Sequence, residues 1–417
     1  MTTITEASCA DDYDPNSMPV AKARAFIHTF LTPVTGVARA PLRDALGRVL
    51  AADIISPLDV PSHRNSAMDG WALRFADLAN TETLTEVGAS FAGNAYAGEM
   101  KAGDCVRIFT GGVVPPYCDT VVMQERASKV EKGVTFAKGI NKGQNVREAG
   151  EDLKAGAVAL ARGRRVRSAE LGLIASLGIG EVAVYRNLRV AFFSTGDELK
   201  QIGQPLGEGQ IYDSNRYTLH GMLTRMGVDV IDMGVVRDDP ALIEAAFREA
   251  SAIADVVITS GGVSVGEADY VKQLMDKLGE VVFWKIAMKP GRPLAYGKIG
   301  SAHFFGLPGN PVSVMVTFYQ FVRDALLTLQ GETPLQVQPL LKAVCTSIIK
   351  KAPGRTEFQR GVLYIEDGVW KVRTTGEQGS GILKSMSDAN CFIMLHDHVG
   401  NVDAGATVDV QILEGVI

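Results

Sequence analysis

The sequence predicts a multidomain fold of the α/β plus β class, in which a domain built on a parallel sheet is combined with smaller β-rich domains. Its length of 417 residues corresponds to about three domains. Beyond Arg189, strand patterns alternate with helical patterns, which is typical of a parallel sheet with helices on both faces. Residues 56–149 and the chain beyond Gly331 instead contain short strands between glycine-rich turns, which indicates a small β domain and a β-barrel or sandwich.

Composition limits the classes of protein to be considered. The chain is 46% hydrophobic and 21% charged with a net charge of −5, so no overall positive field favours nucleic acid or an anionic membrane. Its five cysteines are odd in number and contain no CxxC pair, which argues against a disulfide framework or a zinc cluster. The first residues are polar and acidic, so we expect no signal peptide. We therefore expect a cytoplasmic protein with no nucleic-acid and no membrane partner.

The first elements of the chain are simple. Residues 1–16 are polar and acidic, and we expect them to be disordered. An apolar-periodic helix is predicted from Ser17 to His28. After the β-rich block, a short helix capped by Ser168 is predicted to end before Gly178. The basic run before it is either a solvated structural corner or an anion or partner patch; it consists of Arg162, Arg164, Arg165 and Arg167.

The α/β region can be followed from strand to helix. Strands are predicted for RVAFFST from Arg189, VDVIDMGVV from Val228 and ADVVITSGG from Ala254. A stretch without Asp, Glu, Lys or Arg, from Ile299 to Val322, is interrupted by Pro308 and Pro311, so it indicates a strand, a turn and a helix rather than a membrane span. The predicted helices are one capped by Asp213 or Ser214 that reaches about Met226, one opened by Asp238, Asp239 and Pro240, one from Ala268 to Leu278, and a long one from Pro311.

The loops after these strands carry the candidate site, because ligands of such sheets bind at the carboxyl ends of the strands. The turns SGGVSVG and GLPGNP offer backbone N–H groups to an oxyanion through Ser260, Gly261, Gly262 and Ser264, and through Pro308, Gly309 and Asn310. Lys285, Lys289 and Arg292 supply positive charge for phosphates or a similar oxyanion. Glu198, Asp238 and Asp269 are oxygen ligands of the kind that Mg²⁺ prefers.

Each of these features also has a plain structural interpretation. SGG alone is a strand-to-helix turn, Asp238 is as good a helix cap as a metal ligand, and Glu198 or Asp269 alone could be a solvated charge. The chain contains no GxxxxGK[ST] and no dinucleotide-type GxGxxG, which excludes the usual P-loop and makes a dinucleotide enzyme a poor candidate. His396 and His398 bracket Asp397 at a predicted strand end, a pattern more typical of a surface than of a metal site.

Several long motifs together resemble one family. They are NSAMDGWA from Asn65, RIFTG from Arg107, NVR with GED up to Asp152, STGDEL from Ser194, SGGVSVGEADYVK from Ser260, KPGRP from Lys289 and GLPGNPVS from Gly306. In this order they resemble the MoeA family of molybdopterin molybdenumtransferases, which includes the gephyrin E domain and the plant E domain. The resemblance runs from about residue 17 to the C-terminus. Trp71 departs from it, since Tyr is common at that position.

The resemblance implies an elongated homodimer of four-domain subunits. It implies a linking domain formed by residues 17–55 and 150–185, an inserted β-rich domain at 56–149, a Mog-like α/β domain at 186–330 and a C-terminal β-barrel at 331–417. The active cleft would lie between the α/β domain of one subunit and the inserted domain of the other.

The resemblance also assigns roles to residues. Asp69, Thr110 and Asp152 would face the cleft from the side of the inserted domain, although Asp69 before Gly70 is by itself an ordinary turn pair. Arg360 and Ser380 would line the same region from the C-terminal domain. The α/β domain would contribute Glu198, Asp238, Asp269, Lys285 and Lys289.

The function implied is the insertion of molybdate into adenylylated molybdopterin with release of AMP, in the presence of Mg²⁺. Molybdopterin adenylyltransferase and molybdoenzyme apoproteins or their chaperones are the expected partners. Two other functions stay open: a pterin adenylyltransferase, which would consume ATP, and a dimeric scaffold like the receptor-anchoring gephyrin E domain.

Overall fold

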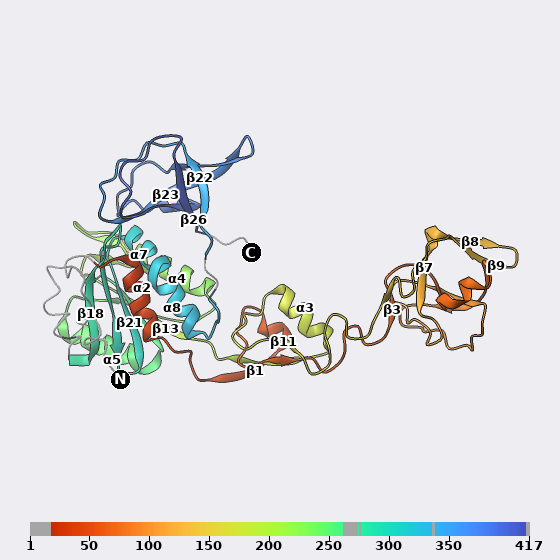
Figure 1. The fold of residues 1–417 in the computed structure, drawn as a ribbon. Coiled ribbons are helices and arrows are strands. Elements are labelled where there is room, and N and C mark those ends of the chain that lie inside the picture. Colours follow the sequence, from red (N-terminus) through yellow and green to blue (C-terminus); the bar gives the residue numbers. More distant parts are fainter. Residues whose placement is uncertain (1–17, 262–273, 275–276, 336–337, 414–417) are drawn as a thin grey trace.

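The computed structural model describes residues 18–261, 274, 277–335 and 338–413. These residues form an elongated molecule (Figure 1). An α/β region and a C-terminal β-barrel lie together at one end, a β-rich sheet lies at the other, and a thin linking region joins them. The fold is therefore mixed α/β with separate β-rich domains, as the sequence predicted.

The α/β region is built on a six-stranded sheet with the order β16–β13–β17–β21–β20–β18. The expected parallel arrangement holds for the first four strands, whereas β20 and β18 are antiparallel to their neighbours. Only Gly300 and Ser301 separate β20 from β21, and so short a connection permits only an antiparallel pair. The bounds are β13 Arg189–Thr195, β16 Asp229–Val236, β17 Val256–Ser260, β18 Gly279–Lys285, β20 Pro293–Ile299 and β21 Ala302–Leu307.

Two helices beside this sheet begin where their capping residues predict. α4 (Ser214–Arg225) is capped by Asp213, whose side chain accepts a hydrogen bond from the backbone N–H of Arg216. α5 (Pro240–Ile253) is capped by Asp239, with proline at its first position. Asp238 is therefore not the cap of this helix. The helix predicted from Ala268 to Leu278 lies largely outside the described residues.

The first helix, α2 (Val20–Thr29), begins three residues later than predicted. Pro19 is its N-cap, and Met18 instead forms a bridge with Ile286 next to the α/β sheet. The buried side of α2, which includes Ala23 and Ile27, packs against the main apolar core. The N-terminal helix is thus part of the α/β region rather than of the linking region.

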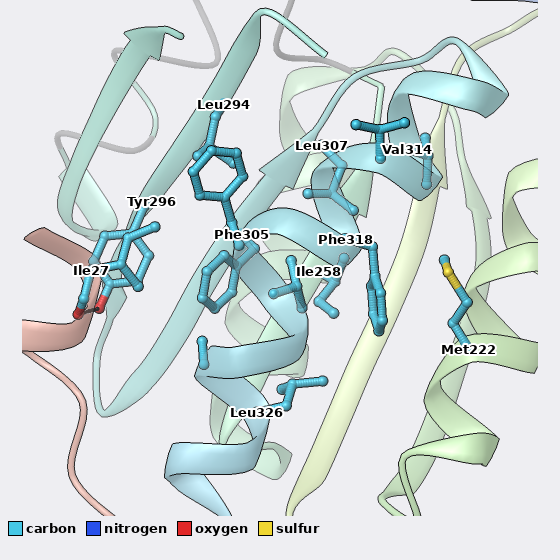
Figure 2. Packing of buried hydrophobic residues seen from close by; sticks show 14 of the residues in the cluster. Ile27, Met222, Ile258, Leu294, Tyr296, Phe305, Leu307, Val314, Phe318 and Leu326 are labelled. Atoms are coloured by element: carbon cyan, nitrogen blue, oxygen red, sulfur yellow. Dashed lines mark hydrogen bonds between the residues drawn. The ribbon is translucent and has the colours of Figure 1, made fainter. Parts of the chain in front are cut away.

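The long helix predicted from Pro311 consists of three consecutive segments. These are α7 (Pro311–Thr317), the π-helical turn η4 (Phe318–Val322) and α8 (Arg323–Leu329). Figure 2 shows Phe318 and Leu326 of this helix packed with Ile258 and Phe305 of the sheet. By length and composition the run could cross a membrane, but 67% of it is buried inside the protein. Its apolar character is therefore explained by the core.

The linking region consists of short paired strands and one helix. Arg164 and Arg167 pair with Glu170, while Arg165 pairs with Glu332, so the basic run is a structural corner. The prediction that Ser168 caps the helix was wrong, because Ser168 is the first residue of the helix. The N-cap is Arg167, whose backbone N–H donates to Glu170 Oε2. The elements are β1 Val37–Pro41, η1 Leu42–Ala45, β2 Ile54–Ile55, β11 Val158–Leu160, α3 Ser168–Ser176 and β12 Glu181–Tyr185.

The β-rich end is a six-stranded sheet with the order β7–β4–β6–β5–β9–β8, and an additional pair is formed by β3 and β10. Glycine-rich turns join these short strands, which explains why short strand patterns and glycines alternate in residues 56–149. The bounds are β3 Asn65–Ser66, β4 Gly70–Leu73, η2 Phe75–Ala79, β5 Thr83–Ser90, β6 Asp104–Ile108, β7 Thr120–Met123, η3 Gln124–Arg126, β8 Ala127–Val130, β9 Gly133–Phe136 and β10 Val146–Arg147.

The C-terminal region is a closed barrel, because β23 pairs with both β24 and β25 and thereby joins the ends of the order β23–β24–β22–β26–β25. One strand from the α/β region, β19 (Met288–Lys289), pairs in parallel with β23. The bounds are β22 Leu341–Cys345, β23 Thr356–Glu366, β24 Val369–Thr374, α9 Lys384–Ser387, β25 Cys391–Leu395 and β26 Thr407–Ile412.

Candidate functional site

A cavity of about 500 Å³ lies at the carboxyl ends of the central strands, between the α/β region and a loop of the barrel. In register, Ser194 of β13 pairs with Ser260 of β17, which pairs with Leu307 of β21, so the loops that follow the three strands start from one edge. The predicted site residues that line this cavity are Glu198, Asp238, Gly261, Lys289, Arg292, Pro308, Gly309, Asn310 and Ser380.

Two glycine turns form the part of the wall made of backbone. Gly261 has a φ of +90°, and a Cβ there would lie 2.8 Å from the carbonyl oxygen of Thr195. Glycine is thus required at this position by both conformation and space. Gly309 lies opposite, since a Cβ on it would be 3.9 Å from the Cα of Gly261. The two turns are therefore close together with no side chain between them, so their backbone N–H groups can bind an oxyanion.

Asn215, at the start of α4, connects these two turns. Its Nδ2 donates to the carbonyl oxygen of Gly309 at 2.7 Å and contacts Oγ of Ser260 at 3.1 Å. Ser260 is only 2% exposed, so its hydroxyl supports the turn from behind and does not line the cavity. Sequence reasoning missed Asn215, although its position in the first turn of a helix capped by Asp213 placed it at the correct end of the sheet.

Two acidic side chains line the cavity. Glu198 folds back over Gly196, where a Cβ would lie 2.4 Å from Glu198 Oε2. Asp238 enters from the loop between β16 and α5. Mg²⁺ is commonly held by one or two carboxylates together with substrate phosphates, so this pair fits such an ion. Among the described residues no group of three His, Cys, Asp or Glu side chains is placed to hold a metal.

Positive charge reaches the cavity from the segment between β18 and β20. Lys289 is 53% exposed at its side chain, and its Nζ lies 3.7 Å from Oε1 of the buried Glu357 in the barrel. Arg292 also lines the cavity. Lys285, the last residue of β18, is not among the lining residues; its carbonyl oxygen accepts a hydrogen bond from the backbone of Met18.

The barrel completes the wall through a loop containing Gln378, Gly379 and Ser380. Arg360 lies beneath this loop, 1% exposed, and donates to the carbonyl oxygens of Gln378 and Gly379. Burial lowers the pKa of Arg360 to about 10. In this structure Arg360 therefore holds the loop and does not itself line the cavity. Gln378 and Gly379 were not predicted, because nothing in their local pattern distinguishes them from an ordinary turn.

The predicted residues of the β-rich end are not brought to this cavity within one chain. Asp69 Oδ1 accepts hydrogen bonds from the backbone N–H and the hydroxyl of Thr110, each at 2.8 Å. Both bonds lower the pKa of the Asp69 carboxyl, and the bond from the backbone N–H has the larger effect. Asp152 is exposed, and its backbone N–H donates to Val60. Asp69 directly precedes β4 and Thr110 follows β6 by two residues, and the sheet of these strands lies at the end of the molecule opposite to the barrel (Figure 1). Asp152 lies between β10 and β11, where the chain returns to the linking region.

Three further predicted residues, Gly262, Ser264 and Asp269, lie outside the described residues. Of the predicted metal-ligand set, the structure therefore places Glu198 and Asp238 together and leaves Asp269 as a prediction.

Comparison with known protein families covers almost the whole chain. The model of the MoeA N-terminal region (domain I and II) matches residues 18–178. A probable molybdopterin binding domain matches residues 191–328. The MoeA C-terminal region (domain IV) matches residues 342–413.

Individual relatives agree with these matches. The chain is 49% identical over 372 residues to the molybdopterin molybdenumtransferase of Haemophilus influenzae, covering 89% of this chain and 92% of that protein. It is 35% identical over 380 residues to the enzyme of that name from Nostoc, covering 89% and 87%. Among solved structures, a molybdopterin biosynthesis moeA protein from Pyrococcus horikoshii superimposes with a TM-score of 0.81 at 28% identity, covering 95% of this chain and 100% of that one.

Proposed function

The chain belongs to the MoeA family of molybdopterin molybdenumtransferases and is a transferase of molybdenum cofactor biosynthesis, and on that premise we propose the reaction in detail. The protein inserts molybdate into adenylylated molybdopterin and releases AMP, with Mg²⁺ in the site. Molybdate and the adenylylated pterin are the substrates.

The composition of the cavity is the observation that carries this proposal. A substrate with a pyrophosphate and a molybdate dianion bring several negative charges into one space. Lys289 and Arg292 offset that charge, and the turns at Gly261 and Gly309 offer backbone N–H groups to oxyanions. The carboxylates of Glu198 and Asp238 would hold Mg²⁺, which would neutralise phosphate charge when it is bound.

We further propose a homodimer whose active site is shared between subunits. Asp69 and Thr110 are joined to each other by hydrogen bonds, and they adjoin β4 and β6 of the β-rich sheet. That sheet lies at the other end of the molecule from the α/β region, which holds the cavity (Figure 1). In a symmetric dimer the β-rich sheet of one subunit would approach the cavity of its partner. Asp152 would face the same cleft. We place the dimer in the cytoplasm, where a molybdopterin adenylyltransferase would supply the substrate and molybdoenzyme apoproteins or their chaperones would receive the product.

The test is an assay of nucleotide products. Purified protein given adenylylated molybdopterin, molybdate and Mg²⁺ should release AMP with no ATP present. Omission of molybdate should slow release sharply, because metal insertion and cleavage of the adenylate are proposed to be coupled. Chelation of Mg²⁺ should have the same effect.

Other outcomes of the same assay separate the alternatives. An adenylyltransferase would consume ATP, release pyrophosphate and need no molybdate. A scaffold without catalytic activity would release no AMP in any arm. AMP that appears only when ATP and unmodified pterin are supplied would overturn the proposed reaction.

A further inference from the structure

The ammonium group of Lys289 lies beside a buried carboxylate that is not part of the cavity wall. Main-chain pairing brings the two residues together, because Lys289 of β19 stands opposite Glu357 of β23 in a parallel register. Lys289 Nζ lies 3.7 Å from Glu357 Oε1. Lys289 lines the cavity, whereas Glu357 is buried and is not among the lining residues. A ligand in the cavity therefore meets Glu357 only through Lys289.

The barrel holds Glu357 in a defined position. Its Oε2 accepts a hydrogen bond from Nε2 of Gln359, which is also buried, at 3.0 Å. The two residues are two positions apart in β23, so their side chains lie on the same face of the strand. Burial removes the water that would stabilise the charge of Glu357, so this carboxylate needs cations close to it.

Lys351 is a second cation that interacts with Glu357. It is 5% exposed, and its Nζ donates to the carbonyl oxygens of Val399 at 2.7 Å and Ala352 at 3.3 Å. Burial, which has the largest effect, lowers the pKa of Lys351, and the charge of Glu357 has the largest effect in the opposite direction. Glu357 therefore interacts with one cation that is fixed inside the barrel and with one, Lys289, that reaches the cavity.

The contact between Glu357 and Lys289 is the one that can be exchanged. At 3.7 Å it is an ionic contact, longer than a hydrogen bond. The side chain of Lys289 is half exposed, and ion pairs with an exposed partner contribute little free energy. If Lys289 turns to a ligand, Glu357 keeps its interactions with Gln359 and Lys351. Transfer of Lys289 from Glu357 to an anion in the cavity therefore costs little.

We propose that Glu357 is a positioning residue that competes with the anionic ligands of the cavity for Lys289. It holds the ammonium group at the cavity wall when no ligand is bound, and the substrate takes this group over. After the reaction Lys289 returns to Glu357, which weakens the binding of AMP and favours its release. The inference rests on the proposed function for the identity of the ligands, since that function makes a phosphate-bearing nucleotide the product.

Binding of AMP and of inorganic pyrophosphate to the full-length protein tests the competition. Glu357→Gln removes the charge but keeps the size of the side chain. Isothermal titration calorimetry at constant ionic strength should give dissociation constants about 3- to 5-fold lower than those of the wild type, the effect of one partly exposed ion pair. Glu366→Gln is the matched control and should bind as the wild type does, since it removes an exposed carboxylate that pairs with Lys371 in the same barrel.

Two double variants separate competition for Lys289 from a general effect of charge. In a Lys289→Ala background, Glu357→Gln should change the affinity for AMP by less than about 1.5-fold, because the group for which Glu357 competes is gone. Glu357→Gln combined with Lys351→Met removes both buried charges and leaves neither unpaired. This variant should bind AMP as tightly as Glu357→Gln, and it provides the measurement if the single variant does not fold.

Steady-state kinetics give a readout that a structural defect would not produce. In the AMP-release assay, Glu357→Gln should have a lower KM for the adenylylated substrate, and AMP should inhibit it at lower concentrations, because ground-state binding of both is tighter. Damage to the barrel would raise KM instead.

Unchanged or weaker binding of AMP by the folded Glu357 variants would overturn the proposal. Equal tightening with and without Lys289 would also overturn it, since the effect would then belong to the general field of the carboxylate. The binding measurements do not depend on turnover. Tighter binding in a protein that releases no AMP would support the inference and reject the proposed function, whereas unchanged binding with molybdate-dependent AMP release would do the reverse.

Discussion

Two side chains of the cavity differ in how the protein holds them. Lys289 extends from a two-residue strand with its side chain half exposed and one acidic neighbour, Glu357. Glu198 is folded against Gly196, so its carboxylate occupies a defined position at the cavity wall. A mobile charge contributes mainly to the attraction of an anion, whereas a fixed carboxylate can position a metal or a reacting group.

Removal of the Lys289 charge should therefore act on substrate binding. We expect Lys289→Ala to raise KM for the adenylylated substrate about 10-fold or more with a smaller change in kcat, because the contact exists before the reaction. Steady-state kinetics of AMP release measure both constants. Lys277→Ala is the matched control, since Lys277 is also exposed and paired with a carboxylate, Glu244. Equal KM values for the two variants would contradict the role of Lys289.

Loss of the Glu198 charge should act on turnover. We expect Glu198→Gln to lower kcat by roughly 10²- to 10⁴-fold, the usual range for a positioned catalytic carboxylate. It should also raise the Mg²⁺ concentration needed for half-maximal rate, whereas circular dichroism should be unchanged. Glu208→Gln, in the exposed segment between β14 (Leu199–Lys200) and β15 (Ile211–Tyr212), should behave as the wild type. An unchanged kcat in Glu198→Gln would remove this residue from the site.

At the scale of elements, local chemistry explains what the sequence could predict. Asp213 and Asp239 have short side chains that satisfy free N–H groups, so both helix starts could be located. The strand-end loops could be identified as the site because parallel strands end at one edge. Contacts between distant segments could not be predicted, since no local pattern encodes them. This applies to Asn215 joining two turns and to Gln378 reaching the cavity from the barrel.

One such contact joins the long helix to two other elements. Within the π-helical turn, the carbonyl oxygen of Gln320 accepts from Arg24 Nε at 2.7 Å, and its Nε2 donates to Gln411 of β26 at 2.8 Å. Gln320 is 1% exposed. This buried network therefore fixes α2 and the barrel to the same helix, and with them the barrel loop that lines the cavity.

Truncation of Gln320 should destabilise this junction. Gln320→Ala keeps the backbone carbonyl that Arg24 Nε contacts, but it removes the side-chain amide that accepts from Arg24 Nη2 and donates to Gln411 Oε1. Two buried polar atoms lose their partner, so we expect the free energy of unfolding to fall by about 2–4 kcal/mol. Denaturant titration measures the change. Thr328→Ala removes only a local hydroxyl bond to Asp324 on the same helix and should change stability by less than about 1 kcal/mol. Equal stability of the two variants would show that the network does not hold the junction.

The basic corner of the linking region gives stability a pH dependence. Hydrogen bonds from the side chains of Arg167 and Arg164 lower the pKa of Glu170 from 4.5 to about 2, and the bond from Arg167 has the larger effect. A lowered folded-state pKa stabilises the fold above the unfolded value, and this contribution is lost as pH falls from 4.5 toward 2. Glu170→Gln should be less stable than the wild type by about 1–3 kcal/mol at pH 7, since both arginines are half exposed and screened.

Unfolding curves at several pH values test this assignment. The difference between Glu170→Gln and the wild type should be constant above about pH 5 and shrink below it. Glu181→Gln, at an exposed position of β12 in the same region, is the control. A difference that stays the same down to pH 3 would show that packing, and not the charge of Glu170, stabilises the corner.

At the scale of the whole molecule, the elongated shape decides what one chain can do alone. The linking region places the sheet that carries Asp69 and Thr110 at the opposite end from the barrel (Figure 1). The thin connection contains the two-stranded pairs β1–β12 and β2–β11, which space the two ends apart. If Asp69 and Glu198 act on the same substrate, they must therefore come from different subunits.

Mixing of inactive subunits tests this arrangement directly. Asp69→Asn is defective in the β-rich end and Glu198→Gln in the cavity, so a heterodimer with shared sites has one site with both defects and one intact site. Random mixing should therefore restore roughly a quarter of wild-type AMP release, because half of the dimers of a two-fold symmetric protein are mixed and each has one working site of two. Heterodimers purified through two different tags should have about half of the wild-type rate for the same reason. Pairing of Asp69→Asn with Thr110→Ala is the matched control, since both changes lie in the same end and every site would carry one of them. Recovery in that control, or none in verified heterodimers of Asp69→Asn and Glu198→Gln, would contradict a cleft formed by the cavity of one subunit and the β-rich sheet of the other.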